Sequence, residues 1–360
     1  MNPAKKNVFV AALDWGLGHT SRSVPLIRLL QKKGCHVIIG VSGMQKVFFE
    51  SECPEAELIP LTGYNIQYSK SLPLSAGLLL SWPRLKKIMQ QENEELKKIC
   101  TDHKIEIIFS DNRYGLYHPD IFSVCITHQL NPQLPFLLNP FRENASATIQ
   151  KLLQPFQEIW IPDSPEIALS GALSINPNFK NIFYSGIQSR FDTNIKTDKT
   201  FLYDIAVMLS GPEPHRSRFE KRILKQLTET SLKAVVFRGM PGIEEIQSTD
   251  NIHIFSHAST QHMQQMISDS HIVLCRAGYS SLCDLIRLNK KAIIIPTPGQ
   301  TEQKYLAEYL SKKGWFHTVG EKKIHLDLDI DKALSLSPIP IESNIGGLLE
   351  QNIQRLLEKL

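Results

Sequence analysis

The sequence predicts an α/β protein made of two Rossmann-like domains with a cleft between them. Both halves alternate short apolar runs of strand type with helical patterns, which is the order of a parallel sheet built from βαβ units. A polar stretch without periodicity separates the halves, and 42% hydrophobic residues in a chain of 360 allow each half its own core. We therefore expect a first domain at 1–187, a linker at 188–200, a second domain at 201–344, and a helix at 345–360 that can cross back to the first domain.

Charge and composition argue against several classes of protein. The net charge of +4 is small for this length, and no basic run exceeds a pair of lysines, which argues against a nucleic-acid-binding protein. The six cysteines are scattered without a C-x-x-C pair, so we expect free thiols and neither disulfides nor a zinc site. The apolar run near the N-terminus is too short for a secretory signal, and no segment reaches the roughly 18–20 apolar residues of a membrane helix. A cytoplasmic protein is expected.

A glycine turn follows the first predicted strand, at residues 7–13. Ligands bind at the carboxyl ends of strands in open α/β sheets, so His19 and Arg22, just after Gly18, are expected at the mouth of a ligand site. The dinucleotide-binding fingerprint is incomplete, because Ser21 stands where its third glycine would be. A turn histidine that bonds to the start of the helix is the alternative reading of His19.

Polar residues also follow two later strands, at residues 105–110 and 124–127. The carboxyl ends of parallel strands lie on one side of a sheet, so these polar residues are expected to converge. The residues expected in this cleft are His19, Asp111, Arg113 and His128, with Arg22, Arg113 and His128 on the acceptor side. For His128, a buried hydrogen-bonded histidine is an equal alternative.

A leucine-rich run at 72–80 leads into a helical pattern at 82–100. This helix begins with Trp82, Arg84, Lys86 and Lys87. A tryptophan among basic residues suits contact with a membrane surface or a lipid-linked acceptor. An ordinary surface helix over the sheet is the alternative.

The most informative stretch is 271–304, which reads as strand, turn, helix, strand and polar loop. A glycine turn that feeds a serine-capped helix directs backbone N–H groups toward an anion. Asp284 follows in the same helix, where it can bind ribose hydroxyls. A similar turn follows the strand at 203–209. The expected donor-site residues on glycine turns and helix starts are Gly18, Ser210, Gly211, Arg276, Gly278, Ser280 and Ser281.

These motifs resemble the two-domain GT-B glycosyltransferases, and most closely glycosyltransferase family 28. The turn of Gly16, Gly18 and His19 is similar to the first glycine loop of that family. The second half is more specific. It has Arg276-Ala277-Gly278 after a strand, an acid six residues past the glycine at Asp284, and Glu302-Gln303-Lys304 after a strand that ends in proline.

The resemblance implies a UDP-sugar donor that carries N-acetylglucosamine or a related hexose, and no cofactor besides this donor substrate. Gly278 and the amides after it would hold the diphosphate. Asp284 would bind the ribose, where the family usually has glutamate. Glu302 and Gln303 would bind sugar hydroxyls, while Lys304 replaces the second glutamine of the family and leaves the sugar open.

Glycosyl transfer needs a stabiliser for the leaving diphosphate and a base for the acceptor hydroxyl. Helix N-termini, helped by Arg276, can supply the first without a metal ion. The alternating aspartates at 327–331 read as the solvated face of a half-exposed strand, and we expect no metal site there. The base is His19 or Asp111, and both stay open. Direct displacement with inversion at the anomeric carbon is expected.

Two other functions stay open, a UDP-sugar 2-epimerase of the same architecture and a non-catalytic nucleotide-sugar-binding protein. An epimerase needs several acids around the sugar, and the obvious ones are Asp111, Glu213 and Glu302. The acceptor is open among a lipid-linked sugar, the end of a polysaccharide and a small molecule.

Overall fold

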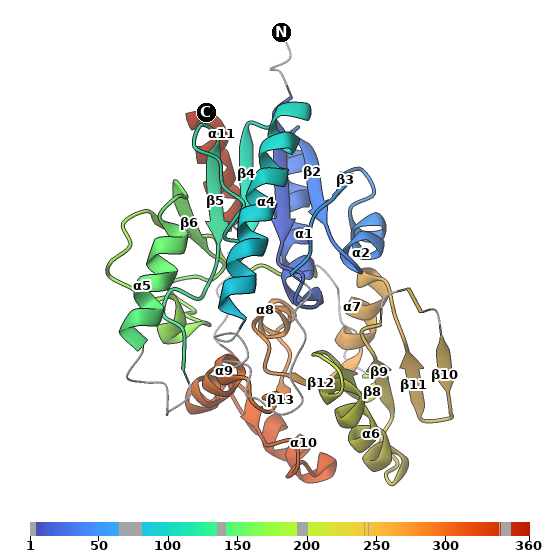
Figure 1. Ribbon diagram of the computed structural model, residues 1–360. Coiled ribbons are helices and arrows are strands. Elements are labelled where there is room, and N and C mark those ends of the chain that lie inside the picture. The colour runs from blue at the N-terminus through green and yellow to red at the C-terminus, as the bar shows by residue number, and fades with distance from the viewer. Residues whose placement is uncertain are drawn as a thin grey trace. The chain divides into compact units, whose positions relative to one another are not determined.

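The computed structural model describes residues 5–64, 81–134, 142–192, 201–240, 242–243, 245–337, 339 and 347–360. It divides the chain into a first unit, residues 1–188 with 342–360, and a second unit, residues 189–341. Each unit contains a seven-stranded sheet flanked by helices (Figure 1). The predicted α/β class with two Rossmann-like sheets is confirmed. The leucine-rich run at 72–80 lies outside the described residues, as do residues 193–200 of the predicted linker.

The sheet of the first unit has the order β3-β2-β1-β4-β5-β6-β7, and every neighbouring pair is parallel. Its strands are β1 (Asn7–Ala12), β2 (His36–Val41), β3 (Glu57–Pro60), β4 (Ile107–Asp111), β5 (Phe122–Ile126), β6 (Glu158–Ile161) and β7 (Ile182–Tyr184). The order reverses at β1, so β1 and β4 lie side by side at a topological switch point, where α/β sheets bind ligands.

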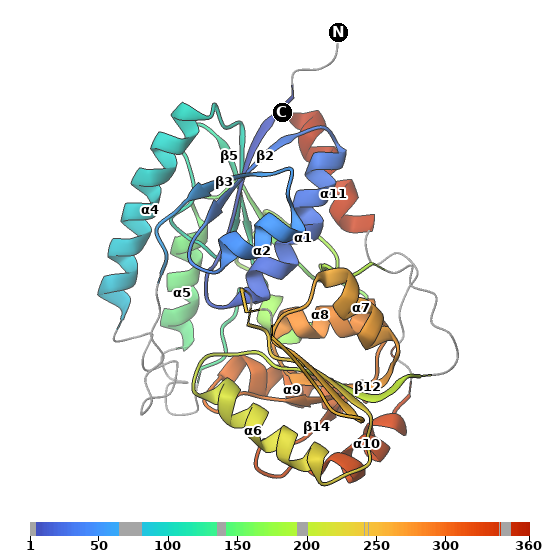
Figure 2. The same cartoon turned by 90° about the vertical axis from the view of Figure 1, so that its right-hand side faces the viewer.

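Side chains of β1 alternate between the two faces of this sheet. Val8 and Val10 pack in one core cluster with residues of α1, α2 and α11, while Phe9 and Ala11 pack in another with residues of α4. Figure 2 shows α4 on one side of the sheet and α1 with α11 on the other. The helices of this unit are α1 (Leu17–Lys32), α2 (Gln45–Glu52), α4 (Trp82–Asp102), α5 (Arg142–Leu153) and α11 (Gly347–Lys359), with the short 3-10 helix η2 (Gly171–Ser174).

The sheet of the second unit has the order β10-β11-β9-β8-β12-β13-β14 and is parallel except for the β10–β11 pair. Its strands are β8 (Tyr203–Met208), β9 (Ala234–Phe237), β10 (Ile246–Ser248), β11 (Ile252–Phe255), β12 (Ser270–Arg276), β13 (Ala292–Ile295) and β14 (His317–Thr318). The carboxyl ends of β8, β12 and β13 are neighbours, so the predicted glycine turns after them meet at one edge.

One face of this second sheet packs against α6 and α10 through apolar side chains that include Phe219 and Ile330. The helices α7 and α8 lie on the opposite face (Figure 2). The helices are α6 (His215–Thr228), α7 (Thr260–Ser268), α8 (Tyr279–Arg287), α9 (Thr301–Lys312) and α10 (Leu326–Leu334).

Three local predictions were wrong. The helix after the first turn begins at Leu17, so His19 lies inside its first turn and does not precede the helix. The helix α8 begins at Tyr279 with Gly278 as its N-cap, so Ser280 and Ser281 are helical residues and not caps. The aspartates at 327–331 lie on helix α10, because Leu326, Ile330 and Ala333 bury one helical face while Leu328 is 61% exposed.

The unit boundaries also differ from the predicted ones. Residues 189–192 belong to the second unit, where the backbone of Asp192 exchanges two hydrogen bonds with the side chain of Gln264 on α7. The terminal helix α11 belongs to the first unit, as expected from the sequence. Arg355 of this helix bonds to Glu158, and Asn352 bonds to the carbonyl of Tyr184.

Candidate active-site residues in the two units

The turn after β1 delivers His19 to the carboxyl edge of the first sheet. Gly16 has φ +88°, a left-handed conformation that favours glycine, and it ends the loop as the N-cap of α1. The loop is held to the neighbouring strand, because the backbone N–H of Leu13 donates to the carbonyl of Asp111 at 2.9 Å. His19 and Asp111 therefore come from adjacent strand ends.

His19 and Asp111 form a close imidazole–carboxylate pair. Nδ1 of His19 lies 2.8 Å from Oδ1 of Asp111, with the histidine side chain 19% exposed and the aspartate 2% exposed. A carboxylate only accepts hydrogen bonds, so a hydrogen bond at this contact requires the tautomer in which Nδ1 carries the proton. Nε2 of a neutral His19 then carries a lone pair, as a general base requires.

A third group, the guanidinium of Arg22, shares the same carboxylate. Its Nε donates to Oδ2 of Asp111 at 2.6 Å and its Nη2 donates to Oδ1, while the whole side chain is 1% exposed. Burial alone would raise the pKa of Asp111, but the charge of Arg22 and the bonds from His19 and Arg22 hold this pKa well below its usual range. Asp111 is therefore a fixed anion and a hydrogen-bond acceptor, which leaves His19 as the better candidate for the base.

The other predicted acceptor-side residues are buried behind this pair. Nη1 of Arg22 lies 3.3 Å from Nδ1 of His128, which is 1% exposed. Arg113 is fully buried and its Nε donates to Oε2 of Glu92 at 3.0 Å. Such burial argues against direct contact of Arg22, Arg113 or His128 with an acceptor.

Glu92, on α4, is a member of this network that we did not predict. It accepts hydrogen bonds from the hydroxyl of Tyr64 at 2.6 Å and from the backbone N–H of Gly115 at 2.8 Å, besides the bond from Arg113. The sequence carried a signal, because Glu92 stands on the apolar face of its helix, in helical register with Leu96. An acid at such a position predicts a buried partner.

In the second unit, two of the predicted glycine turns meet a third loop at the same sheet edge. Gly211, after β8, has φ +104°, and a Cβ placed on it would lie 3.9 Å from the hydroxyl of Thr297. A Cβ placed on Gly278 would lie 3.8 Å from Nε2 of Gln303. Gln303 also accepts a hydrogen bond from the backbone N–H of Thr297 at 2.8 Å, so it ties the loop after β13 to the turn after β12.

The remaining predicted donor-site residues differ in exposure. Ser210 and Gly211 are exposed, while Gly18, Gly278, Ser280, Ser281 and Glu302 are half-buried. Arg276 is 1% exposed. Its guanidinium contacts Glu321 at 2.8 Å and lies 4.0 Å from the centre of the Phe219 ring, so its charge is already paired inside the second unit.

Asp284 is buried on α8, with 6% exposure. The hydroxyl of Ser189 donates to its Oδ1 at 2.5 Å, a contact that we did not predict. Burial raises the pKa of Asp284 to about 6, which the bond from Ser189 and the charge of Arg190 only partly offset. In this structure, the Asp284 carboxylate holds Ser189, the first residue of the second unit, against α8.

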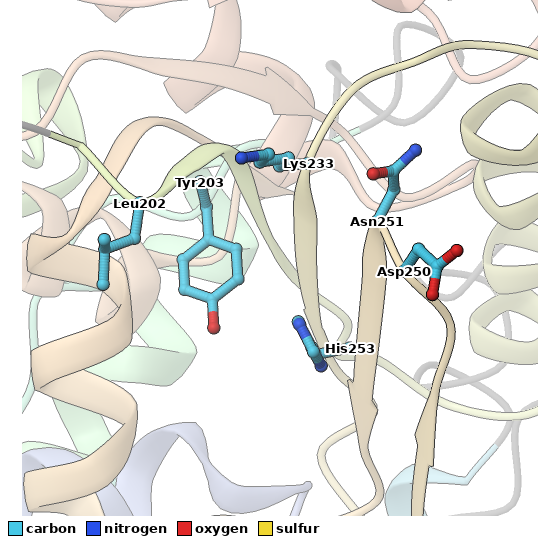
Figure 3. A pocket seen from close by; sticks show the side chains of 6 residues that line it. All are labelled: Leu202, Tyr203, Lys233, Asp250, Asn251 and His253. Atoms are coloured by element: carbon cyan, nitrogen blue, oxygen red, sulfur yellow. The ribbon is translucent and has the colours of Figure 1, made fainter.

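A cavity of about 200 Å³ lies at the opposite edge of the second sheet (Figure 3). Its lining residues are Leu202, Tyr203, Lys233, Asp250, Asn251 and His253. They lie at or next to the amino-terminal ends of β8, β9 and β11, away from the glycine turns. This cavity therefore belongs to neither group of predicted site residues.

Comparison with known protein families matches residues 218–335 to the model of the glycosyltransferase family 28 C-terminal domain. The matched residues all lie in the second unit. The resemblance stated from the sequence is thereby confirmed, and the matched segment includes Arg276, Gly278, Asp284, Glu302 and Gln303. A bacterial relative adds to this. The chain is 31% identical over 91 residues to the UDP-N-acetylglucosamine--N-acetylmuramyl-(pentapeptide) pyrophosphoryl-undecaprenol N-acetylglucosamine transferase of Caldanaerobacter subterraneus subsp. tengcongensis. This match spans 25% of the chain and 23% of the relative.

Solved structures of glycosyltransferases share the fold over the whole chain. The glycotransferase of kitacinnamycin has a TM-score of 0.63 and 12% identity, with 99% of each chain covered. MurG of Acinetobacter baumannii has a TM-score of 0.54 and 12% identity, with 99% of this chain and 100% of MurG covered. At these identities the similarity shows the fold alone, and it confirms the predicted GT-B architecture.

Proposed function

We propose that this protein is a glycosyltransferase that moves a sugar from a nucleotide-sugar donor to an acceptor hydroxyl, with His19 as the general base. The single observation that carries the proposal is the contact between His19 Nδ1 and Asp111 Oδ1 at 2.8 Å. Asp111 fixes the tautomer, so Nε2 of His19 can take the proton of the acceptor hydroxyl. The acceptor oxygen then bonds to the anomeric carbon, while the bond to the diphosphate breaks and its electron pair leaves with the diphosphate. A single displacement of this kind inverts the anomeric carbon.

The second unit is proposed to bind the donor. The family 28 match at 218–335 supports this, as do the turns at Gly211 and Gly278 at one sheet edge. Helix α8 begins directly after the turn at Gly278, and the positive end of a helix dipole suits a diphosphate without a metal ion. We propose a UDP-sugar of N-acetylglucosamine or a related hexose, which agrees with the donor in the name of the bacterial relative. No further cofactor is proposed.

The acceptor is proposed to be lipid-linked, in line with the undecaprenol in the name of that relative. The start of α4 supports contact with an anionic membrane surface, because Arg84, Lys86 and Lys87 are exposed and Lys86 lies 5.8 Å from the centre of the Trp82 ring. No helix of the described residues is long and apolar enough to span a bilayer. Sedimentation with vesicles of anionic or of neutral lipid tests this part, and equal binding to both would contradict it.

The activity is tested by incubating the purified chain with UDP-N-acetylglucosamine and a panel of lipid-linked and soluble acceptors. UDP release that depends on the acceptor, with an inverted product linkage by NMR, is the expected result. Formation of a 2-epimerised sugar would contradict the transferase, and donor binding without turnover on any acceptor would favour a binding protein.

Variants then separate the roles of the residues. We expect His19→Gln and Asp111→Asn to lower kcat by about 10²–10⁴-fold with little change in donor affinity. Asp284→Ala is expected to weaken donor binding. Arg28→Gln is the matched control, because Arg28 lies on the same helix as His19 but pairs with Glu52 at the surface. Unchanged turnover in both His19→Gln and Asp111→Asn would refute the assignment of the base.

A further inference from the structure

Arg22 lies one helical turn after His19 on α1, and both contact the same carboxylate oxygen of Asp111. Oδ1 of Asp111 accepts from His19 Nδ1 at 2.8 Å and from Arg22 Nη2, while Oδ2 accepts from Arg22 Nε at 2.6 Å. Arg22 Nη2 also lies 2.9 Å from His19 Nδ1. A permanent cation thus stands against the inner nitrogen of the proposed base.

This arrangement changes the charge balance of the pair. In an isolated imidazole–carboxylate pair, proton uptake by the imidazole turns a net charge of −1 into zero. With Arg22 present the group is already neutral, and proton uptake by His19 leaves a net charge of +1 on a cluster in which Arg22 and Asp111 are 1–2% exposed and His19 is 19% exposed. Because a charge in such surroundings is poorly solvated, the arginine opposes protonation of His19.

Other titratable groups also lie around Asp111 and Arg22. His128 contributes Nδ1 at 3.3 Å from Nη1 of Arg22. Burial raises the pKa of Tyr114 and of the Cys125 thiol, so both stay neutral. Arg22 and Asp111 are the charged side chains that contact Nδ1 of His19.

We infer that Arg22 is a positioning residue that neutralises Asp111 and so keeps His19 unprotonated, and ready to accept a proton, at lower pH. This inference rests on the proposed function in taking His19 as the base. Asp111 then acts on His19 in one main way. It orients the imidazole through the hydrogen bond, while Arg22 cancels most of the negative charge of Asp111. It also gives Arg22 a role that does not require contact with the acceptor.

The test is an NMR titration of the full chain with isotope-labelled histidine, in which the His19 signal is assigned by its loss in His19→Gln. In Arg22→Gln we expect the midpoint of the His19 titration to rise by about one pH unit or more, because the carboxylate charge is then uncompensated. In Asp111→Asn the midpoint falls. In the double variant Arg22→Gln/Asp111→Asn it returns toward the midpoint of the unchanged chain.

A surface arginine on the same helix supplies the control. Arg28→Gln removes an equal charge from α1 and should leave the His19 titration in place, since Arg28 pairs with Glu52 at 3.0 Å and is 43% exposed. In the activity assay, the midpoint of the acid limb of the kcat/KM pH profile is expected to move to higher pH in Arg22→Gln, together with the midpoint of the His19 titration.

An unchanged or lower midpoint in Arg22→Gln would overturn the inference. If that variant does not fold, Asp111→Asn and the double variant differ only at position 22, and equal midpoints in these two would overturn it. The titration needs no turnover. A chain without transferase activity would contradict the proposed function while the effect of Arg22 on His19 is still measured.

Discussion

Asp284 combines deep burial with an ionisable group, and its replacement by asparagine has a predictable effect on stability. The asparagine side chain would keep an oxygen for the hydroxyl of Ser189, which lies 2.5 Å from Oδ1 in the natural chain. The substitution removes the charge and replaces the other carboxylate oxygen by an NH2 group. Burial raises the pKa of Asp284 from 3.8 to about 6, so ionisation of this carboxylate opposes folding.

The sign and size follow from linkage between protonation and folding. A raised pKa in the folded state contributes stability that is fully present below the ordinary pKa of aspartate and is lost as the pH rises through about 6. A difference of about two pH units corresponds to about 3 kcal/mol. Because part of this stability is already lost at pH 4, Asp284→Asn should gain about 2.5 kcal/mol in free energy of unfolding, relative to the natural chain, between pH 4 and pH 8.

The measurement is urea unfolding at both pH values, followed by ¹⁹F NMR of the chain labelled with fluorotryptophan. Trp315 is the tryptophan of the second unit, so its signal reports on the unit that contains Asp284. Asp327→Asn is the control, because Asp327 is exposed and its neutralisation should change stability by less than about 0.5 kcal/mol at either pH. An equal effect of Asp284→Asn at pH 4 and pH 8 would refute the reasoning.

Two further predictions concern the first unit. Gly115→Ala should destabilise the chain by about 3 kcal/mol or more, since the new Cβ would clash with the carbonyl oxygen of Met89 on α4. Thermal unfolding measures this loss, and Gly320→Ala, whose new Cβ would have nothing within 4 Å, should be near neutral in the same measurement. Arg355→Met should cost about 2–3 kcal/mol, because Arg355 makes two hydrogen bonds to Glu158 at 2.8 and 2.6 Å. If the free energy of unfolding in urea falls by less than about 0.5 kcal/mol, the ion pair does not contribute the expected stability.

Local patterns in the sequence predicted the sheets and the placement of His19 and Asp111 well. Apolar strands followed by glycine or polar residues are short-range signals, and the parallel sheet brings their carboxyl ends together whatever lies between. In the register of β1 and β4, Ala12 pairs with Asp111, so the turn that leads to His19 begins beside Asp111 as expected.

Long-range pairs between side chains were not predictable in the same way. Ser189 and Asp284 are 95 residues apart, and nothing near either residue indicates the other. The aspartates on α10 were misread because Leu326, Leu328 and Ile330 alternate like a strand, although Asp329 is turned inward by His317 at 2.8 Å. In these cases the partner decides the conformation, and the partner is distant in sequence.

The return of the chain to the first unit has a consequence for its synthesis. Leu349, Ile353 and Leu356 of α11 belong to the same core cluster as Val8 and Val10 of β1. During synthesis, β1 must therefore wait for α11, which is made much later, before this core cluster is complete, while the second unit can fold without α11. Removal of α11 would leave an incomplete core in the unit that contains β1.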